Sequence, residues 1–225
     1  MDNLLSNIKI KVNDKVFIKD PESSELGKRI VQGTIGLIDE IGFEQFTFKK
    51  LAKEIKTSEA SIYRYFDSKH HLLVYITLWY WGWMEYRIVF KLMNIESAEE
   101  RLTIAVKTLT EVIEEDKDFN HINKVKLHRI VIRESSKIYL NKSVDNENSE
   151  GFFLAYKRLV ERVVKIILEI NPTYKYPHML VSTIIEGAHH QRYFAKHLPR
   201  LTDIVNGEDA VTTFYQKMAL TQLKD

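Results

Sequence analysis

Near the N-terminus, charged, hydroxyl and aromatic residues are mixed in a way that suits contact with a polyanion. The stretch TSEASIYRYFDSKHHLL spans residues 57–73. Ser61 is short enough to permit close approach, and Arg64 can donate paired hydrogen bonds to a guanine edge or a phosphate. Ile62 and Phe66 are four residues apart, so they share one helical face that would turn toward a core. The residue types therefore predict a helix with one buried face and one binding face.

Local charge agrees with such a surface, although the whole chain is nearly neutral. The 225 residues carry a formal net charge of +2, whereas residues 47–71 hold six lysine or arginine residues and three acidic ones. Any contact with nucleic acid must therefore come from this local patch. The alternative is that the lysines only solvate helix faces, which is the usual role of a charge cluster. Charge alone leaves both interpretations open.

Three short helices are predicted to position this stretch. Apolar residues at helical spacing define the first, which ends at Gly42 because glycine readily takes the left-handed conformation found at helix ends. Thr47 is placed to cap a second helix and Ser58 a third. Their connection at Lys56-Thr57 is tight. This layout predicts a helix-turn-helix, whose third helix lies in the major groove of DNA.

Helical patterns continue almost to the C-terminus. A fourth helix is expected from Asp67 or Ser68 through residue 90. Further helices are expected near residues 98–115, 119–140, 150–170, 175–198 and 208–222. A polar loop is expected at residues 141–149. Residues 8–18 alternate and are β-branched, which predicts a short hairpin or an extended arm.

The predicted fold class is all-α. An N-terminal three-helix helix-turn-helix DNA-binding domain would precede a larger C-terminal helical domain for ligand binding and dimerisation. The expected boundaries are 1–21 for the N-terminal arm or hairpin, 22–71 for the DNA-binding domain and 72–225 for the regulatory and dimerisation domain.

Composition excludes several kinds of site. The chain has no cysteine, which excludes disulfides, thiolate zinc sites and a cysteine nucleophile. We find no signal peptide and no run of about 18 apolar residues, so a cytoplasmic protein is expected. No nucleophile elbow, zinc-protease motif or glycine-rich phosphate loop is visible, so we predict no catalytic residues, no cofactor and no enzyme. Pairs such as His121 and His128 lack a clear third ligand, and no metal is predicted.

A set of residues across these helices carries a resemblance to a known family. The set comprises Ile30, Leu37-Ile38, Gly42-Phe43, Thr47, Leu51-Ala52, Ser58, Ser61-Ile62-Tyr63, Tyr65-Phe66, Ser68-Lys69 and Leu72-Leu73. This segment resembles the DNA-binding domain of the TetR family of bacterial transcriptional regulators. Two positions depart from the family pattern, because Lys56 stands where glycine is usual and Tyr65 where histidine is common.

The resemblance implies roles for individual residues on an operator of double-stranded DNA. Thr47 and Lys49 would contact the backbone at the start of the second helix. Tyr63 and Lys69 would bind phosphates, and Ser58 lies on the same outer side of the third helix. The residues that would face the bases are Glu59, Ala60, Ser61, Arg64 and Tyr65.

The fourth helix contains WYWGWMEY, residues 79–86, with aromatic residues on more than one face. We interpret them as a pocket for a small hydrophobic or aromatic molecule. The alternative is that the rings fill a core. The candidate pocket residues are Ile76, Trp79, Tyr80, Trp83, Tyr86 and Arg87. Because the larger domain of TetR-like regulators generally binds a small molecule, the resemblance implies an effector, and we expect a repressor that the effector releases.

A single helix-turn-helix domain makes too few contacts with DNA for useful sequence specificity, so a homodimer is expected. Gly187 interrupts a predicted helix at a cost of about 1 kcal/mol relative to alanine, which close approach of another helix would explain. The candidate interface residues, in a four-helix bundle, are Ile184, Gly187, Gln191, Phe194, Phe214 and Met218. The alternative is ordinary packing within one chain.

The rival interpretation of the whole chain is an all-helical protein-interaction scaffold that does not bind DNA. Affinity that falls steeply with salt would distinguish a DNA-binding protein from such a scaffold. The N-terminal arm carries Lys9, Lys11, Lys15 and Lys19 and could lie against DNA or pair with its own chain. The sequence leaves both roles open.

Overall fold

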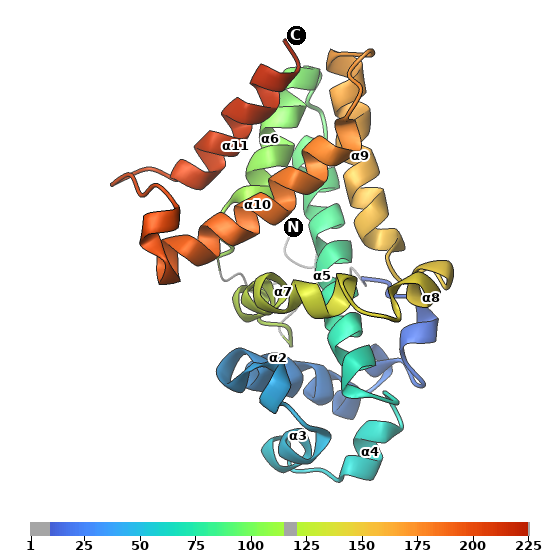
Figure 1. Cartoon of the computed structure of the whole chain (residues 1–225). Helices are drawn as coiled ribbons and strands as arrows, with labels where there is room; N and C mark the ends of the chain where they lie inside the picture. Colours follow the sequence, from blue (N-terminus) through green and yellow to red (C-terminus); the bar gives the residue numbers. More distant parts are fainter. Residues whose placement is uncertain (1–9, 115–120, 225) are drawn as a thin grey trace. The chain divides into compact units, whose positions relative to one another are not determined.

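A computed structural model describes residues 10–114 and 121–224 (Figure 1). Within these ranges every regular element is helical, which confirms the all-α prediction. The elements are the 3₁₀-helices η1 (Asp14–Val16), η2 (Pro21–Ser23) and η3 (Pro199–Leu201), and the α-helices α2 (Glu25–Gln45), α3 (Phe48–Glu54), α4 (Glu59–Tyr63), α5 (Lys69–Leu92), α6 (Ala98–Thr110), α7 (Lys124–Tyr139), α8 (Val144–Ser149), α9 (Leu154–Ile170), α10 (Pro177–His197) and α11 (Ala210–Gln222). Residues 1–9 of the predicted arm and 119–120 of a predicted helix lie outside the described ranges.

The chain forms two compact units. The first comprises Met1–Gly82 and Ile113–Leu154, and the second Trp83–Val112 and Ala155–Asp225. Helix α5 therefore contributes residues 69–82 to the first unit and residues 83–92 to the second. The segment expected to bind DNA belongs wholly to the first unit, together with α7 and α8.

Local sequence explains the limits of the helices around the predicted binding face. The hydroxyl of Thr47 accepts from the N–H of Lys50 at 3.2 Å, and that of Ser58 accepts from the N–H of Ser61 at 3.2 Å. Both predicted caps are thus confirmed. Gly42 has φ +76° inside α2, so the helix is interrupted where the sequence predicted an end. The three helices α2, α3 and α4, which we call the reading head, are blue to cyan in Figure 1.

The reading head is held together by apolar side chains from each of its helices and from α5. The fully buried residues include Ile30, Ile38, Leu51, Ile62, Phe66 and Leu72. Burying each such side chain contributes roughly 1.5–3 kcal/mol. This core lies under α4 and leaves the opposite face of that helix outward.

Helix α7 packs against α2 through an ion-pair cluster that the sequence did not reveal. Arg129 donates from Nε to Oδ1 of Asp39 at 2.9 Å, and Arg133 donates to the same oxygen at 3.0 Å. Partial burial alone raises the pKa of Asp39, but the hydrogen bond and charge of Arg129, with the charges of Arg133 and Lys126, bring it below its ordinary value. The cluster therefore stabilises α2 against α7 while Asp39 is ionised.

The described part of the N-terminal segment, from residue 10 on, forms no hairpin, so the extended arm is the alternative that remains. The side chain of Asn13 accepts from the N–H of Lys15 at 3.0 Å and begins η1, so the chain turns where a second strand was expected. Three of the alternating apolar residues, Ile10, Val12 and Val16, are buried, with Val16 at 1% exposure, whereas Ile18 is exposed. Phe17 meets Tyr75 of α5 edge to face at 5.9 Å. We call residues 10–24 the N-terminal strap.

Residues 141–149 were predicted to be a loop, yet they contain helix α8. Asn141 caps the preceding helix by donating to the carbonyls of Lys137 at 3.1 Å and Ile138 at 2.8 Å. Glu147 is buried, and its Oε1 lies 2.6 Å from Nε2 of His70. The pattern was missed because the short helix is almost entirely polar and has no apolar periodicity.

In the second unit, α6, α10 and α11 pack against one another (green, orange and red in Figure 1). Ser97 caps α6 by accepting from the N–H of Glu100 at 3.3 Å. Arg101 of α6 pairs with Glu169 of α9. Among the described residues, no helix is both long and apolar enough to cross a membrane.

Candidate nucleic-acid interface

The outer face of α3 and α4 carries most of the residues predicted to touch DNA. Tyr63 is 50% exposed, whereas Ile62 beside it and Phe66 are fully buried. Ser61 is partly exposed. The predicted contact residues that are exposed are Thr47, Lys49, Ser58, Glu59, Ala60, Tyr63 and Arg64. The short helix α4 therefore presents a polar face because its apolar face is fixed in the core.

The cations on this face are free to attract a polyanion. Lys49, Lys53 and Arg64 are exposed, and none of them has a carboxylate partner within the part of the chain that the structure describes. Lys50 instead donates to the carbonyl of Gln45 at 2.8 Å. Cations without protein partners release counterions when they meet phosphates, which favours binding of nucleic acid at low salt.

An aromatic residue that sequence reasoning overlooked supports Tyr63. The ring of Phe48, the first residue of α3, meets the ring of Tyr63 edge to face at 4.9 Å. Phe48 is buried, so it fixes the direction of the tyrosine while half of that side chain stays exposed. The apolar residue at the start of α3 was the available signal, because it directly follows the Thr47 cap.

Tyr65 does not reach the outer face, which corrects its predicted role at the bases. Its side chain is 3% exposed, and its hydroxyl lies 2.7 Å from Oγ of Ser24. Helix α4 ends at Tyr63, so Tyr65 no longer follows the helical wheel used to place it. Tyr65 is therefore part of the support of α4 and not of its binding face.

Lys69 also has partners other than the predicted phosphate. Its Nζ lies 3.2 Å from the carbonyl oxygens of both Phe43 and Phe46, and 4.6 Å from the ring centroid of Phe43. The last carbonyls of a helix lack intrahelical donors, and a lysine can satisfy them. Lys69 thus caps the end of α2.

Lys56, which stands where glycine is usual in the resembling family, lies in the turn between α3 and α4. This residue has φ +52°, in the left-handed region that glycine prefers. The N–H of Thr57 donates to the carbonyl of Ala52 at 2.9 Å, which is the bond that closes such a helix end. A non-glycine residue in this conformation costs on the order of 1 kcal/mol.

The candidate pocket residues divide between the two units. Ile76, Trp79, Tyr80 and Trp83 are buried, and Tyr86 and Arg87 are partly exposed. In the first unit, the Tyr80 hydroxyl lies 2.8 Å from Nδ1 of His128. In the second, the Arg87 guanidinium lies 4.8 Å from the Trp83 ring centroid. These rings therefore make core contacts, and their role toward an effector stays a prediction.

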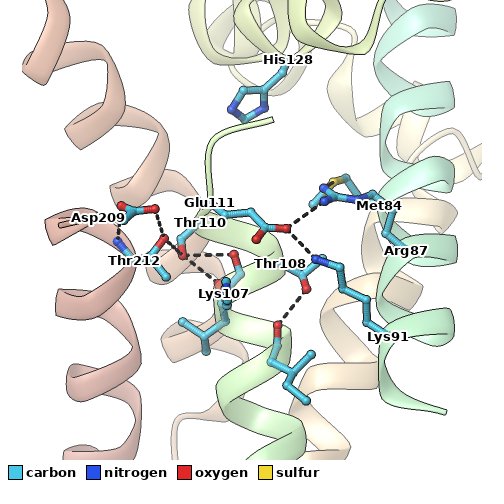
Figure 2. Close-up of polar contacts among 12 residues, drawn as sticks. Met84, Arg87, Lys91, Lys107, Thr108, Thr110, Glu111, His128, Asp209 and Thr212 are labelled. Carbon is cyan, nitrogen blue, oxygen red and sulfur yellow. Dashed lines mark hydrogen bonds and ion pairs between the residues drawn. The ribbon is translucent and has the colours of Figure 1, made fainter. Parts of the chain in front are cut away.

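A polar cluster lies at the C-terminal end of α6 (Figure 2). Glu111, the residue after the helix, accepts from Arg87 at 2.8 Å and from Lys91 at 2.7 Å. Thr110 donates from Oγ1 to Oγ1 of Thr212 at 3.0 Å. The charged residues Arg87, Lys91 and Glu111 are therefore paired with one another within the second unit.

Arg192 completes the closure of that helix end. Its Nε and Nη2 donate to the carbonyl of Thr110 at 2.9 and 2.6 Å, and Nη2 lies 2.6 Å from Oδ1 of Asp209. Partial burial raises the pKa of Asp209, but bonds from Arg192 and Thr212 outweigh burial and lower it. The guanidinium therefore joins α6, α10 and the start of α11.

Two residues of the predicted dimer interface are used inside the chain. Ile184 is buried at 1% exposure. A Cβ placed on Gly187 would lie 2.2 Å from the hydroxyl oxygen of Tyr215, so this glycine permits α10 to approach α11. Ordinary intrachain packing, the alternative that the sequence left open, explains both residues, and their part in a dimer stays a prediction. Phe214 is 58% exposed, and the partly exposed members of the set are Gln191, Phe194 and Met218.

Comparison with known families identifies the reading head. A profile described as "Bacterial regulatory proteins, tetR family" matches residues 30–76, from α2 into α5. The match therefore covers most of the reading head and the start of α5. The match agrees with the resemblance that the sequence indicated for this segment.

Solved structures resemble the chain in fold. FadR of Bacillus subtilis, solved with stearoyl-CoA, has a TM-score of 0.60 and 15% identity, covering 86% of this chain and 97% of its own. AibR, solved with isovaleryl coenzyme A and operator DNA, has a TM-score of 0.57 and 13% identity, covering 85% and 95%. The superantigen PfiT has a TM-score of 0.59 and 14% identity, covering 90% and 97%. At such identities the likeness concerns the fold alone. No curated protein has significant sequence similarity to the chain.

Proposed function

We propose that this protein is a TetR-family homodimeric repressor that binds operator DNA and is released by a small hydrophobic or aromatic effector. The observation that carries the proposal is the outward face of α4 and the cations beside it. Arg64 is exposed there without a carboxylate partner in the described residues, while Ile62 is fully buried beneath it. A fixed inner face lets the outer face keep its orientation when it meets a duplex.

The reading head would place α4 in the major groove. Ser61 permits close approach to the groove floor, and Arg64 donates to a guanine edge. Thr47 and Lys49, at the start of α3, contact the backbone and set the orientation of the head. Contacts with the bases would determine sequence preference, and contacts with the phosphate backbone would contribute the salt-dependent part of the affinity.

Dimer formation would bring two reading heads onto one operator, with half-sites roughly 34–36 Å apart. Support comes from large apolar side chains that are exposed along α10, η3, the segment that follows η3, and α11. These residues are Tyr193, Leu198, Leu201, Ile204, Val205 and Phe214. Such a concentration of exposed apolar residues is typical of a protein interface.

The proposed dimer can be tested with matched substitutions. Phe214→Asp is expected to convert dimers to monomers in analytical ultracentrifugation and to lower operator affinity. Phe90→Asp is the control, because Phe90 is equally exposed, at 57% against 58%, but lies on α5. A wild-type protein that sediments as a monomer at all concentrations would exclude the homodimer.

The proposed effector follows from the aromatic residues of α5 and from the ligands of the similar structures. FadR was solved with stearoyl-CoA and AibR with isovaleryl coenzyme A, and both ligands carry an apolar acyl group. Trp79, Trp81 and Trp83 are the three tryptophans of the chain, so intrinsic fluorescence reports on α5 alone. An effector is expected to change this fluorescence and to release bound DNA over the same concentration range.

DNA binding itself is tested by fluorescence anisotropy with a duplex from upstream of the protein's own coding region and with an unrelated duplex. A regulator binds the first more tightly, and its affinity for both falls steeply as salt rises. Weak affinity that salt does not change would favour the rival interpretation, a helical protein-interaction scaffold.

A further inference from the structure

The N-terminal strap contacts Tyr65 on three sides. The N–H of Ile18 donates to the backbone carbonyl of Tyr65 at 2.8 Å. The ammonium of Lys19 lies 5.2 Å from the centroid of the tyrosine ring. The Tyr65 hydroxyl lies 2.7 Å from Oγ of Ser24. Residues 18–24 therefore lie directly beside the residue that follows Arg64.

The strap is also fixed at a distance from Tyr65. Asn13 donates from its side chain to the carbonyl of Glu150 at 2.9 Å. Val16 is buried, and Phe17 meets the ring of Tyr75. A segment held at several points need not be ordered when a ligand binds, so a contact made by one of its side chains loses little affinity to entropy.

Lys19 is the charged residue of the strap that lies beside α4. It is exposed and, among the described residues, has no carboxylate partner. The nearby acids have other roles, because Asp20 accepts from the N–H of Glu22 at 2.9 Å and Glu22 lies 2.8 Å from His121. Lys19 is therefore an exposed cation that lies against Tyr65, two residues beyond the end of α4.

We propose that Lys19 contacts a DNA phosphate and that the N-terminal strap extends the DNA interface beyond the reading head. The proposal rests on the proposed DNA binding of α3 and α4. Phosphates border the groove on both sides of a recognition helix, so a cation beside the end of α4 meets backbone before it meets bases. Lysine suits that role because it acts as a compact point charge. Lys19 consequently adds affinity without adding sequence preference.

The test is the salt dependence of DNA affinity for Lys19→Met, a change that keeps an apolar stem over the Tyr65 ring and removes the charge. Loss of one phosphate contact lowers the slope of log affinity against log salt by about 0.9. Affinity is expected to fall severalfold, by the same factor on the operator and on unrelated duplexes. Lys19→Arg, which retains the charge, is expected to keep the wild-type slope.

Lys15→Met is the matched control. Lys15 is an exposed lysine of the same strap, but it lies in η1, beside the Asn13 that contacts Glu150. Its substitution is expected to leave the slope unchanged. An unchanged slope in Lys19→Met overturns the proposal, even where affinity falls, because a structural role would lower affinity without altering counterion release. A wild-type protein without salt-dependent binding would refute the proposed function instead.

Discussion

The reading head and the end of α6 use arginine in opposite ways. Arg64 is exposed and has no carboxylate partner in the described part of the chain. Arg192 is largely buried and divides its donors between the Thr110 carbonyl and Asp209. A cation whose donors are satisfied inside the protein stabilises the fold, whereas a cation left in solvent can stabilise a complex. The partners of a charge, and not its residue type, therefore indicate its function.

Two tyrosines repeat this contrast within the reading head. Tyr63 is half-exposed on the binding face, and Tyr65, two residues later, is 3% exposed and bonded to Ser24. The end of α4 between them changes the direction of the chain. The end of α4 thus separates Tyr63, a candidate DNA contact, from Tyr65, which supports the fold.

Among these variants, Arg192→Ala is expected to cause the largest loss of folding stability. It leaves the Thr110 carbonyl and Asp209 without their charged donor, so the free energy of unfolding is expected to fall by roughly 3–4 kcal/mol. Urea denaturation measures the change. Arg200→Ala, at an exposed arginine of η3, is expected to alter stability by less than about 0.5 kcal/mol. Equal losses in the two variants would contradict the assignment.

His189 is a titrating residue that is buried in the second unit. Burial lowers the pKa of His189 from 6.5 to about 4. Between pH 6.5 and pH 4, His189 is protonated in the unfolded chain but neutral in the folded chain. Its neutral form therefore costs no stability above pH 6.5, and the free energy of unfolding decreases as the pH falls toward 4. The loss is roughly 2–3 kcal/mol at pH 4. His189→Gln is expected to flatten this part of the stability profile, and an unchanged profile would exclude His189 as its cause.

Arg64→Ala should show the outward role. Because Arg64 has no carboxylate partner among the described residues, the free energy of unfolding is expected to change little. Preference among duplexes is expected to change by about 1–3 kcal/mol at one base-pair position. Competition binding with a set of single-substituted operators measures this preference. Retention of the wild-type preference would mean that Arg64 does not read bases.

Lys56→Gly is expected to have the smallest effect, and it is expected to raise folding stability where Arg192→Ala lowers it. It relieves the positive φ of Lys56, so stability is expected to rise by about 1 kcal/mol or less. Lys53→Gly, within helix α3, is the control and is expected to destabilise by about 1 kcal/mol. Thermal unfolding of both variants measures the difference, and destabilisation of Lys56→Gly would show that Lys56 is not strained.

Local chemistry made much of the reading head predictable. The caps at Thr47 and Ser58 depend on residues three positions away, and the burial of Ile62 follows from helical spacing. The all-α class follows from the same periodicity over longer segments. These features need no knowledge of distant neighbours.

Other features depended on tertiary neighbours and could not be predicted. The Lys69 ammonium meets carbonyls at the end of α2, and Tyr65 meets the strap through Ser24. Both residues have types suited to DNA contact, so composition and spacing alone could not reveal these contacts. Burial excludes Tyr65 from the outer face, whereas the phosphate contact of Lys69 stays a prediction. The neighbour of Gly187 was unpredictable for the same reason, because the close approach that its lack of a side chain permits is to Tyr215 of the same chain.

Gly82 has a consequence for how the chain can vary. A Cβ at this position of α5 would lie 2.6 Å from Cγ2 of Ile10, so the missing side chain makes room for the strap. Alanine at position 82 becomes compatible with the fold when position 10 becomes smaller. We therefore expect these two sites, remote in sequence, to covary among close homologues as a compensating pair.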